Sequence, residues 1–317
     1  MSSFAEFSRH KQASAIRRAL EGIVDASSVR LVLHGFNSTF RVQVGDHDLA
    51  VRLNINSRRT LPMVQGEVDF IQQAQKQGVR VPHPVPIFEG SPITTTWVEG
   101  LDHEVPVVAY AWMPGRSPSD TCAPATLFKV GALMASLQQA TRGWQTANTR
   151  QRPTYREVLD GQPWRMSTPA ATKVRERADA VIKSLGQPQL VHFDLHLSNV
   201  KLHQGALTVF DFDDSVWSHP AVDAAQSLFY FRRGKQAQQA ETAFWQGFGM
   251  AVEDLGIDRE TLELLIAARA VLLANEVLGS VSQELSQMAP AYAEVTERRL
   301  QNYLDTGIYD PKVAKMS

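Results

Sequence analysis

The chain changes character at Pro114-Gly115, where a strand-rich part gives way to an almost wholly helical one. Runs of β-branched and apolar residues between turn residues predict strands at 29–33, 39–44, 49–53, 93–97 and 107–112. Amphipathic periodicity predicts helices at 4–23 and 63–77. We therefore predict an α+β protein with a small N-terminal lobe, residues 1–114, and a larger helical C-terminal lobe, residues 115–317.

Beyond residue 115 the sequence predicts helices at 125–140, 220–231, 236–255, 259–281 and 289–304, with one or two more within 150–185. One segment, 190–214, interrupts them. Its apolar stretches at 200–202 and 207–210 predict two short strands, and Gln204-Gly205 between them predicts a tight turn. The segment is thus a loop followed by a hairpin.

Composition limits the class of partner. The formal charge of −1 argues against a dedicated nucleic-acid binder, which usually has a basic bias. The single cysteine, Cys122, excludes an intramolecular disulfide and fits a reducing, cytoplasmic setting, and the first residues lack the apolar core of a signal peptide. The most apolar stretch, 262–278, carries three charged residues and favours a buried helix over a membrane span. We expect no membrane or nucleic-acid partner; nothing in the sequence indicates the oligomeric state.

The interrupting segment carries the strongest chemical signal. His192, Asp194 and Asn199 have the spacing H-x-D-x-x-x-x-N, and Asp211 follows Asn199 after twelve residues, at the end of the predicted hairpin. This is the spacing of a phosphoryl-transfer loop, with a base followed by two metal ligands. Asn and Asp oxygens suit Mg²⁺, whose remaining ligands would be nucleotide phosphates. The pattern predicts Asp194 as the base and Asn199 and Asp211 as the metal ligands.

Other interpretations of the same residues remain open. His192, Asp194 and His196 alternate and would share one face of a strand, as in a transition-metal hydrolase. The acidic residues Asp211, Asp213 and Asp214 could form an ordinary turn. For His192 we favour a structural role, with the ring packed under the loop, and for His196 that of an ordinary polar residue.

These motifs make the chain similar to a phosphotransferase family that includes aminoglycoside phosphotransferases, choline kinases and type II homoserine kinases. The resemblance covers about residues 30–280 and is strongest at HFDLHLSNV, FDFDD and PAVDAA. Phe193 stands where the family usually has glycine. The resemblance implies a two-lobe, protein-kinase-like fold, with Asp194 as the catalytic base, Asn199 and Asp211 on magnesium, and Asp223 bracing the catalytic loop. Asp223 could equally be a charge at a helix N-terminus, and Asp213 would add a carboxylate beside the metal.

The resemblance also assigns a nucleotide site in the first lobe. Arg52, in AVRL, would hold the α/β-phosphates and pair with Glu67, although either could be a surface charge. The loop with Gly35 and Ser38 would cover the phosphates. The backbone of the hinge-like segment, formed by Tyr110, Ala111, Trp112 and Met113, would bind adenine unless it is simply a core strand.

The function that the resemblance implies is Mg²⁺-dependent transfer of the γ-phosphate of ATP to a hydroxyl of a small molecule, such as an amino alcohol, an amino acid or an aminoglycoside-like compound. One alternative is a protein Ser/Thr kinase, although the chain has no A-P-E motif. Another is a nucleotide-binding module without catalysis. No short motif decides the acceptor; an acidic pocket, which Asp213, Asp214 and Glu276 could help to form, would suit a cationic amine.

Overall fold

The computed structural model describes residues 9–23, 29–34, 37–55, 59–119, 122–234, 236–280 and 283–315. The chain divides into two units, the first comprising residues 1–115 and 145–152, the second residues 116–144 and 153–317. The lobe boundary expected after residue 114 remains a prediction, and the structure groups the later segment 145–152 with the first unit. Gly35 lies outside the described residues.

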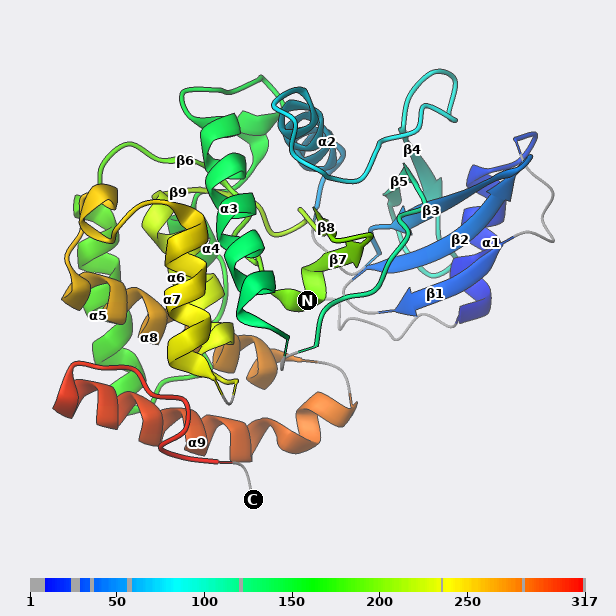
Figure 1. Ribbon diagram of the computed structural model, residues 1–317. Helices are drawn as coiled ribbons and strands as arrows, with labels where there is room; N and C mark the ends of the chain where they lie inside the picture. Colours follow the sequence, from blue (N-terminus) through cyan, green and yellow to red (C-terminus); the bar gives the residue numbers. More distant parts are fainter. Residues whose placement is uncertain are drawn as a thin grey trace. The chain divides into compact units, whose positions relative to one another are not determined.

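A five-stranded antiparallel sheet forms the first unit (Figure 1). Its strands are β1 (Arg30–His34), β2 (Ser38–Val44), β3 (His47–Leu53), β4 (Ile93–Trp97) and β5 (Glu104–Ala111), in the order β1-β2-β3-β5-β4. The strand predicted at 107–112 begins earlier and ends one residue sooner than expected. The two helices of the unit are α1 (Arg9–Ala19) and α2 (Leu61–Lys76).

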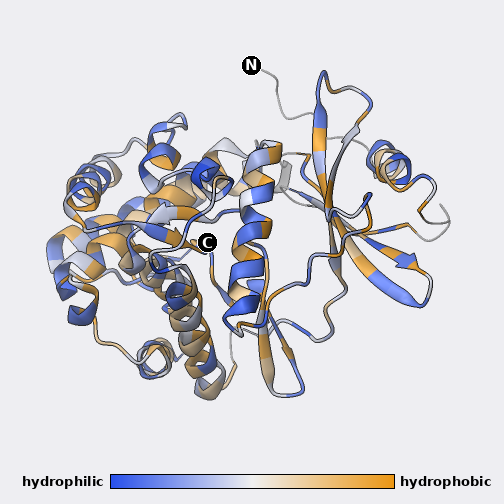
Figure 2. Cartoon of the chain, turned by 90° about the horizontal axis from the view of Figure 1, so that it is seen from above, coloured by the Kyte–Doolittle hydropathy of each residue, from blue (hydrophilic) through white to orange (hydrophobic). Residues whose placement is uncertain are grey.

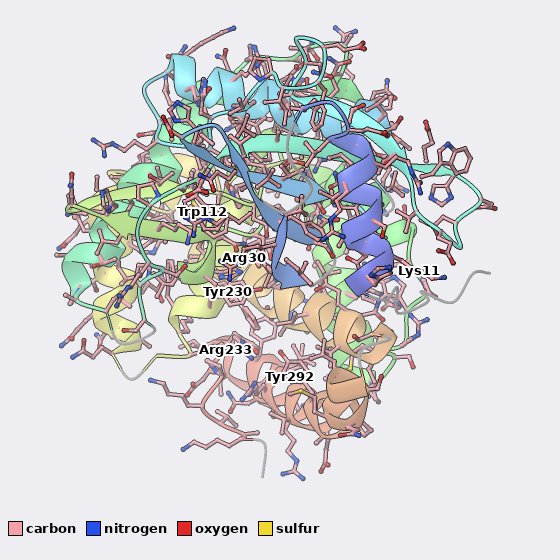
Figure 3. The ribbon with its side chains drawn as sticks, turned by 90° about the vertical axis from the view of Figure 1, so that its right-hand side faces the viewer. Lys11, Arg30, Trp112, Tyr230, Arg233 and Tyr292 are labelled. Atoms are coloured by element: carbon pink, nitrogen blue, oxygen red, sulfur yellow. The ribbon has the colours of Figure 1, made fainter. Side chains whose placement is uncertain are left out.

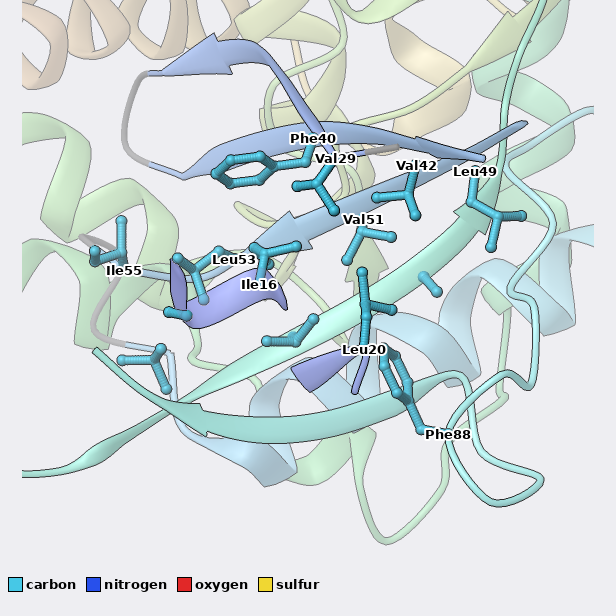
Figure 4. Close-up of a cluster of buried hydrophobic side chains, with 14 of the residues drawn as sticks. Ile16, Leu20, Val29, Phe40, Val42, Leu49, Val51, Leu53, Ile55 and Phe88 are labelled. Carbon is cyan, nitrogen blue, oxygen red and sulfur yellow. The ribbon is translucent and has the colours of Figure 1, made fainter. Parts of the chain in front are cut away.

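Strand alternation decides what each face of this sheet does. Val51 and Leu53 of β3 join Val107 and Ala109 of β5 in a buried cluster with Ile16 and other residues of α1 (Figure 4). Because successive side chains of a strand point to opposite faces, Arg52 points away from this cluster. Figure 2 shows hydrophobic and hydrophilic residues along the same strands, as such two-faced strands require.

The segment 145–152 packs closely on α2. Thr146 Oγ1 and Asn148 Nδ2 donate to Asp69 at 2.6 and 3.1 Å. A Cβ at Gly66 would lie 2.7 Å from the carbonyl oxygen of Asn148, so only glycine allows this approach. The contact stabilises the helix that carries Glu67.

Helices dominate the second unit: α3 (Pro124–Thr141), α4 (Tyr155–Asp160), α5 (Pro169–Ser184), α6 (Pro220–Phe231), α7 (Ala237–Phe248), α8 (Arg259–Gly279) and α9 (Gln283–Thr306). The predicted hairpin is present as β7 (Val200–His203) and β8 (Ala206–Val209). A second pair, β6 (Gln189–Val191) and β9 (Val216–Ser218), brackets the loop and hairpin. Within the described residues no helix is both long and apolar enough to cross a membrane.

The helix predicted to run to residue 23 ends at Ala19, and two helices of the second unit differ more from expectation. The single helix predicted at 236–255 is wrong: α7 stops at Phe248, because Gly249 takes a left-handed conformation with φ of 73° and ends the helix. A separate turn of 3₁₀-helix follows at Glu253–Leu255. The last helix begins at Gln283 rather than 289 and contains Pro290.

Candidate active site

His192 connects the predicted catalytic loop to the hairpin. Its buried ring donates from Nε2 to the carbonyl oxygen of Phe210 at 3.1 Å, and its Nδ1 accepts from the backbone N–H of Asp194 at 3.4 Å. Burial lowers the pKa of His192 to about 4, so the ring is neutral near pH 7. A neutral histidine used in this way sets the position of the loop backbone.

Phe193 explains why glycine is usual at this position. Its φ is 70°, in the left-handed region that favours glycine. Its ring is buried against Tyr155, with centroids 5.0 Å apart, and its N–H donates to Asp223 Oδ1 at 2.8 Å. Asp223 lies buried in the first turn of α6, where burial raises its pKa to about 6. The loop backbone is therefore held from α6 through the Asp223 carboxylate.

Asp194 accepts hydrogen bonds on both carboxylate oxygens. Oδ1 accepts from Tyr230 at 3.2 Å and from Arg269 at 3.1 Å; Oδ2 accepts from Asn199 at 3.1 Å and lies 3.2 Å from His196 Nε2. Burial alone would raise the pKa of Asp194, but the His196 hydrogen bond and the Arg269 charge outweigh it and hold this pKa well below its ordinary range. The carboxylate is therefore ionised and fixed in orientation.

His196 contacts Asp194 as one specific tautomer. Its Nδ1 accepts from the backbone N–H of Ser198 at 3.2 Å, which leaves the proton on Nε2, the atom that faces Asp194. The ring also packs on Tyr230, with centroids 4.5 Å apart. His196 thus belongs to the site rather than being the ordinary polar residue expected.

Arg269 is a buried charge, 5% exposed, on α8. Its Nη2 donates to Tyr230 at 2.8 Å as well as to Asp194, and its Nη1 lies 3.6 Å from Glu276. Burial opposes the charged form, but the surrounding oxygens raise the pKa of Arg269 well above its ordinary value. Burial raises the pKa of Glu276 to about 7. The positive charge of Arg269 lowers this pKa, whereas the nearby Asp214 carboxylate raises it.

The open end of the hairpin brings Asn199 and Asp211 together. Val200 pairs with Val209, and the N–H of Phe210 donates to the carbonyl oxygen of Asn199 at 2.9 Å. Asp211 directly follows Phe210, so it lies at the same end of the hairpin as Asn199. Asp211 has a φ of 66° and is exposed.

The donor set at this end fits Mg²⁺. Both bonds of the Asn199 amide to Asp194 use its nitrogen, so its oxygen remains as the ligand atom. One amide oxygen and the Asp211 carboxylate suit a hard cation that phosphates would also coordinate. Asp213 is buried and Asp214 exposed in the turn that follows.

In the first unit the structure joins Arg52 to Glu67. Arg52 Nη2 donates to Glu67 Oε2 at 2.5 Å, and the two side chains are 9% and 1% exposed. The hydroxyl of Tyr110 donates to Glu67 Oε1 at 3.2 Å. Neither Arg52 nor Glu67 is therefore the surface charge considered as an alternative in the sequence analysis. Tyr110 contacts this ion pair through its side-chain hydroxyl.

The hinge-like segment has little free backbone. The N–H of Ala111 donates to the carbonyl of His83 at 2.8 Å, and that of Trp112 to Asp48 at 3.0 Å. The N–H groups of Ala111 and Trp112 are therefore already used within the fold, and an adenine contact by this segment remains a prediction. Ser38 is buried as the first residue of β2, which does not support a contact with a phosphate.

The transition-metal alternative fails on geometry. His192 uses both ring nitrogens on backbone groups. Among the described residues no group of three or more His, Cys, Asp or Glu side chains could hold a metal ion.

Three residues of the site were not found from the sequence: His196, Tyr230 and Arg269. The one available signal was Arg269 itself, a lone basic residue in the apolar stretch 262–278, because a buried charge requires partners. Its partners Asp194 and Tyr230 lie 75 and 39 positions away, and no sequence pattern points to them.

Solved structures share this fold. An aminopropanol kinase associated with a microcompartment has a TM-score of 0.75 at 20% identity, over 94% of this chain and 99% of that one. An amicoumacin kinase in complex with AMP-PNP and Ca²⁺ has a TM-score of 0.71 at 18% identity, over 86% and 89%. The α+β, kinase-like fold expected from the sequence is confirmed.

Sequence comparison identifies the family. The chain belongs to the phosphotransferase enzyme family, whose model matches residues 28–261. It is 27% identical over 292 residues to an uncharacterized protein of Deinococcus radiodurans, 84% of this chain and 83% of the relative. Amicoumacin kinase of Bacillus subtilis is 23% identical over 195 residues, so the match spans 59% of this chain and 58% of that kinase. The chain is therefore a phosphotransferase with an alcohol group as acceptor, and the resemblance stated above is confirmed.

Proposed function

We propose that the protein transfers the γ-phosphate of ATP, with Mg²⁺, to a hydroxyl group of a small molecule. The observation that carries this proposal is the Asp194 carboxylate, ionised and fixed by four donors, beside the oxygen ligands Asn199 and Asp211. Phosphoryl transfer needs mainly positioning and charge neutralisation, and this arrangement supplies both. The relatives named for amicoumacin and aminopropanol support a small-molecule acceptor.

Asp194 would orient the acceptor hydroxyl for in-line attack. A bond forms between the hydroxyl oxygen and the γ-phosphorus while the bond from that phosphorus to the bridging oxygen of ADP breaks, and the hydroxyl proton passes to Asp194. The low pKa of Asp194 means that it takes the proton late, so orientation is its larger contribution.

Other residues would hold the nucleotide. Asn199 and Asp211 would bind Mg²⁺, which supplies charge neutralisation at the phosphates. Arg52, oriented by Glu67, would bind the α/β-phosphates, and the Met113 backbone would bind adenine. Gly35 stays a predicted phosphate contact.

A protein kinase is the weaker candidate. From Asp211 to the start of α6 at Pro220 the chain forms only a turn and the short strand β9. This leaves no length for an activation segment that could bind a peptide.

The test is ADP release from Mg²⁺-ATP with a panel of small alcohols and a panel of peptides. Asp194→Asn should keep ATP binding and lose about 10²–10⁴ in transfer rate. Asp160→Asn, at an exposed ion pair with Arg156, is the control and should be unchanged. Wild-type turnover in Asp194→Asn, or transfer only to peptides, would refute the proposal.

A further inference from the structure

A cavity of about 460 Å³ opens beside Asp194, entirely within the second unit. This volume can hold a small organic molecule. His196 and Tyr230 line it, and both contact Asp194, whereas neither Asn199 nor Arg269 is among its described lining residues. A molecule in the cavity can therefore reach the carboxylate by replacing one of the two lining donors.

Arg233 gives this cavity its charge. Of the described lining residues it alone carries a permanent charge, and none carries a carboxylate. Figure 3 labels Arg233 and Tyr292 in the same part of the molecule. The Arg233 guanidinium donates to the hydroxyl of Tyr292 at 3.3 Å and lies 5.1 Å from the ring centre of Phe229. An exposed arginine held in this way is oriented before a ligand arrives, which lowers the entropy cost of binding.

The end of α6 places Arg233 close to Tyr230, which contacts Asp194. The N–H of Arg233 donates to the carbonyl of Tyr230 at 3.1 Å, so the helical turn continues past the helix end. Residues three apart on such a turn share a face, with Cβ atoms about 5–6 Å apart. The remaining wall includes apolar side chains of Leu127, Leu197 and Phe231.

We propose that the acceptor is a hydroxy acid with an apolar carbon skeleton. Its carboxylate binds Arg233, and its hydroxyl takes the place of His196 or Tyr230 on Asp194. Arginine suits this task because its planar fork matches a carboxylate. The inference rests on the proposed function and names the substrate class of the same site.

The described cavity is not the acidic pocket that the sequence analysis considered as one option. Asp213, Asp214 and Glu276 are absent from its described lining residues. A cationic amine in this cavity would face Arg233 without a counter-charge there.

The test uses three acceptors of one chain length: hydroxyl-terminated hexanoate, hydroxyl-terminated hexylamine and hexanediol. With Mg²⁺-ATP, the wild type should show kcat/KM for the acid about tenfold or more above the amine, since a charged hydrogen bond contributes at least about 1.5 kcal/mol. Arg233→Gln should remove this preference and Arg233→Glu should reverse it, mainly through KM. Arg156→Gln is the control at an exposed arginine, and circular dichroism checks that each variant folds.

The outcomes separate the two proposals. A preference for the amine, or an acid preference that survives in Arg233→Glu, overturns the hydroxy-acid inference, while any ATP-dependent transfer lost in Asp194→Asn upholds the function. If none of the three is phosphorylated, calorimetry with the hydroxyl-terminated hexanoate decides: binding lost in Arg233→Glu supports the inference, and no binding to the wild type overturns it.

Discussion

Replacing Arg269 with methionine should expose how strongly the site depends on one buried charge. Methionine keeps an unbranched chain of similar reach but removes the guanidinium from Asp194, Tyr230 and Glu276. At 3.1 Å and an effective dielectric constant of about 20, the attraction between Arg269 and Asp194 is about 5 kcal/mol before the cost of desolvating both groups. Removing one partner of a buried pair typically costs about 3–5 kcal/mol, which is the loss of unfolding free energy that we expect.

This loss should depend on pH in a defined direction. The folded-state pKa of Asp194 is lowered, so its contribution is present above the ordinary carboxyl pKa of about 4 and is lost as the pH falls toward the folded value. The gap between wild type and Arg269→Met should therefore narrow as the pH falls through about 7, where Glu276 beside Arg269 takes up a proton, and narrow again below about pH 4. Urea unfolding across this range measures it.

Catalysis should change as well, because Asp194 loses one of the donors that fix its orientation. We expect kcat to fall about 10–10²-fold, with the affinity for ATP unchanged, and Arg269→Lys to recover part of the rate. Arg177→Met, at an exposed pair with Glu260, is the matched control and should cost less than about 1 kcal/mol. Wild-type stability and kcat in Arg269→Met would refute the reasoning.

Three further changes test the rest of the site. The single variants Arg52→Met and Glu67→Met should each lose about 3 kcal/mol of unfolding free energy, measured with urea, and should bind ATP more weakly. The double variant should lose less than the sum of the two single losses, and additive losses would contradict an interaction between Arg52 and Glu67. As the pH falls from about 6.5 to about 4, the wild type should lose about 3 kcal/mol of unfolding free energy, because His192 binds a proton in the unfolded state but stays neutral when buried. His192→Asn should remove this pH dependence, and an unchanged dependence of unfolding free energy on pH would contradict the assignment. Phe193→Gly should relieve about 1–2 kcal/mol of backbone strain but lose about 3–5 kcal/mol of packing on Tyr155, so urea unfolding should show a net loss with kcat nearly kept; equal or higher stability would count against it.

Some features of this protein can be predicted from sequence because they are local. Asp194, Asn199 and Asp211 lie within eighteen residues, and backbone bonds of one loop and one hairpin bring them together, so their spacing alone predicts the chemistry. Strand alternation is equally local and separates Arg52 from the apolar residues of β3. Helix ends are less secure: the sequence 236–255 has a continuous apolar pattern, and the stop at Phe248 depends on the left-handed Gly249.

The environment of Asp194 was decided only by tertiary structure. Tyr230 and Arg269 reach Asp194 from α6 and α8, and Arg233 turns toward the cavity from the end of α6. Nothing in the spacing of Asp194, Tyr230 and Arg269 relates them, because helix packing rather than chain connectivity sets those distances. The sequence by itself therefore predicted the reaction chemistry, through residues joined by short stretches of backbone. The charge of the cavity beside it follows from which helix faces meet, and no sequence pattern indicated it.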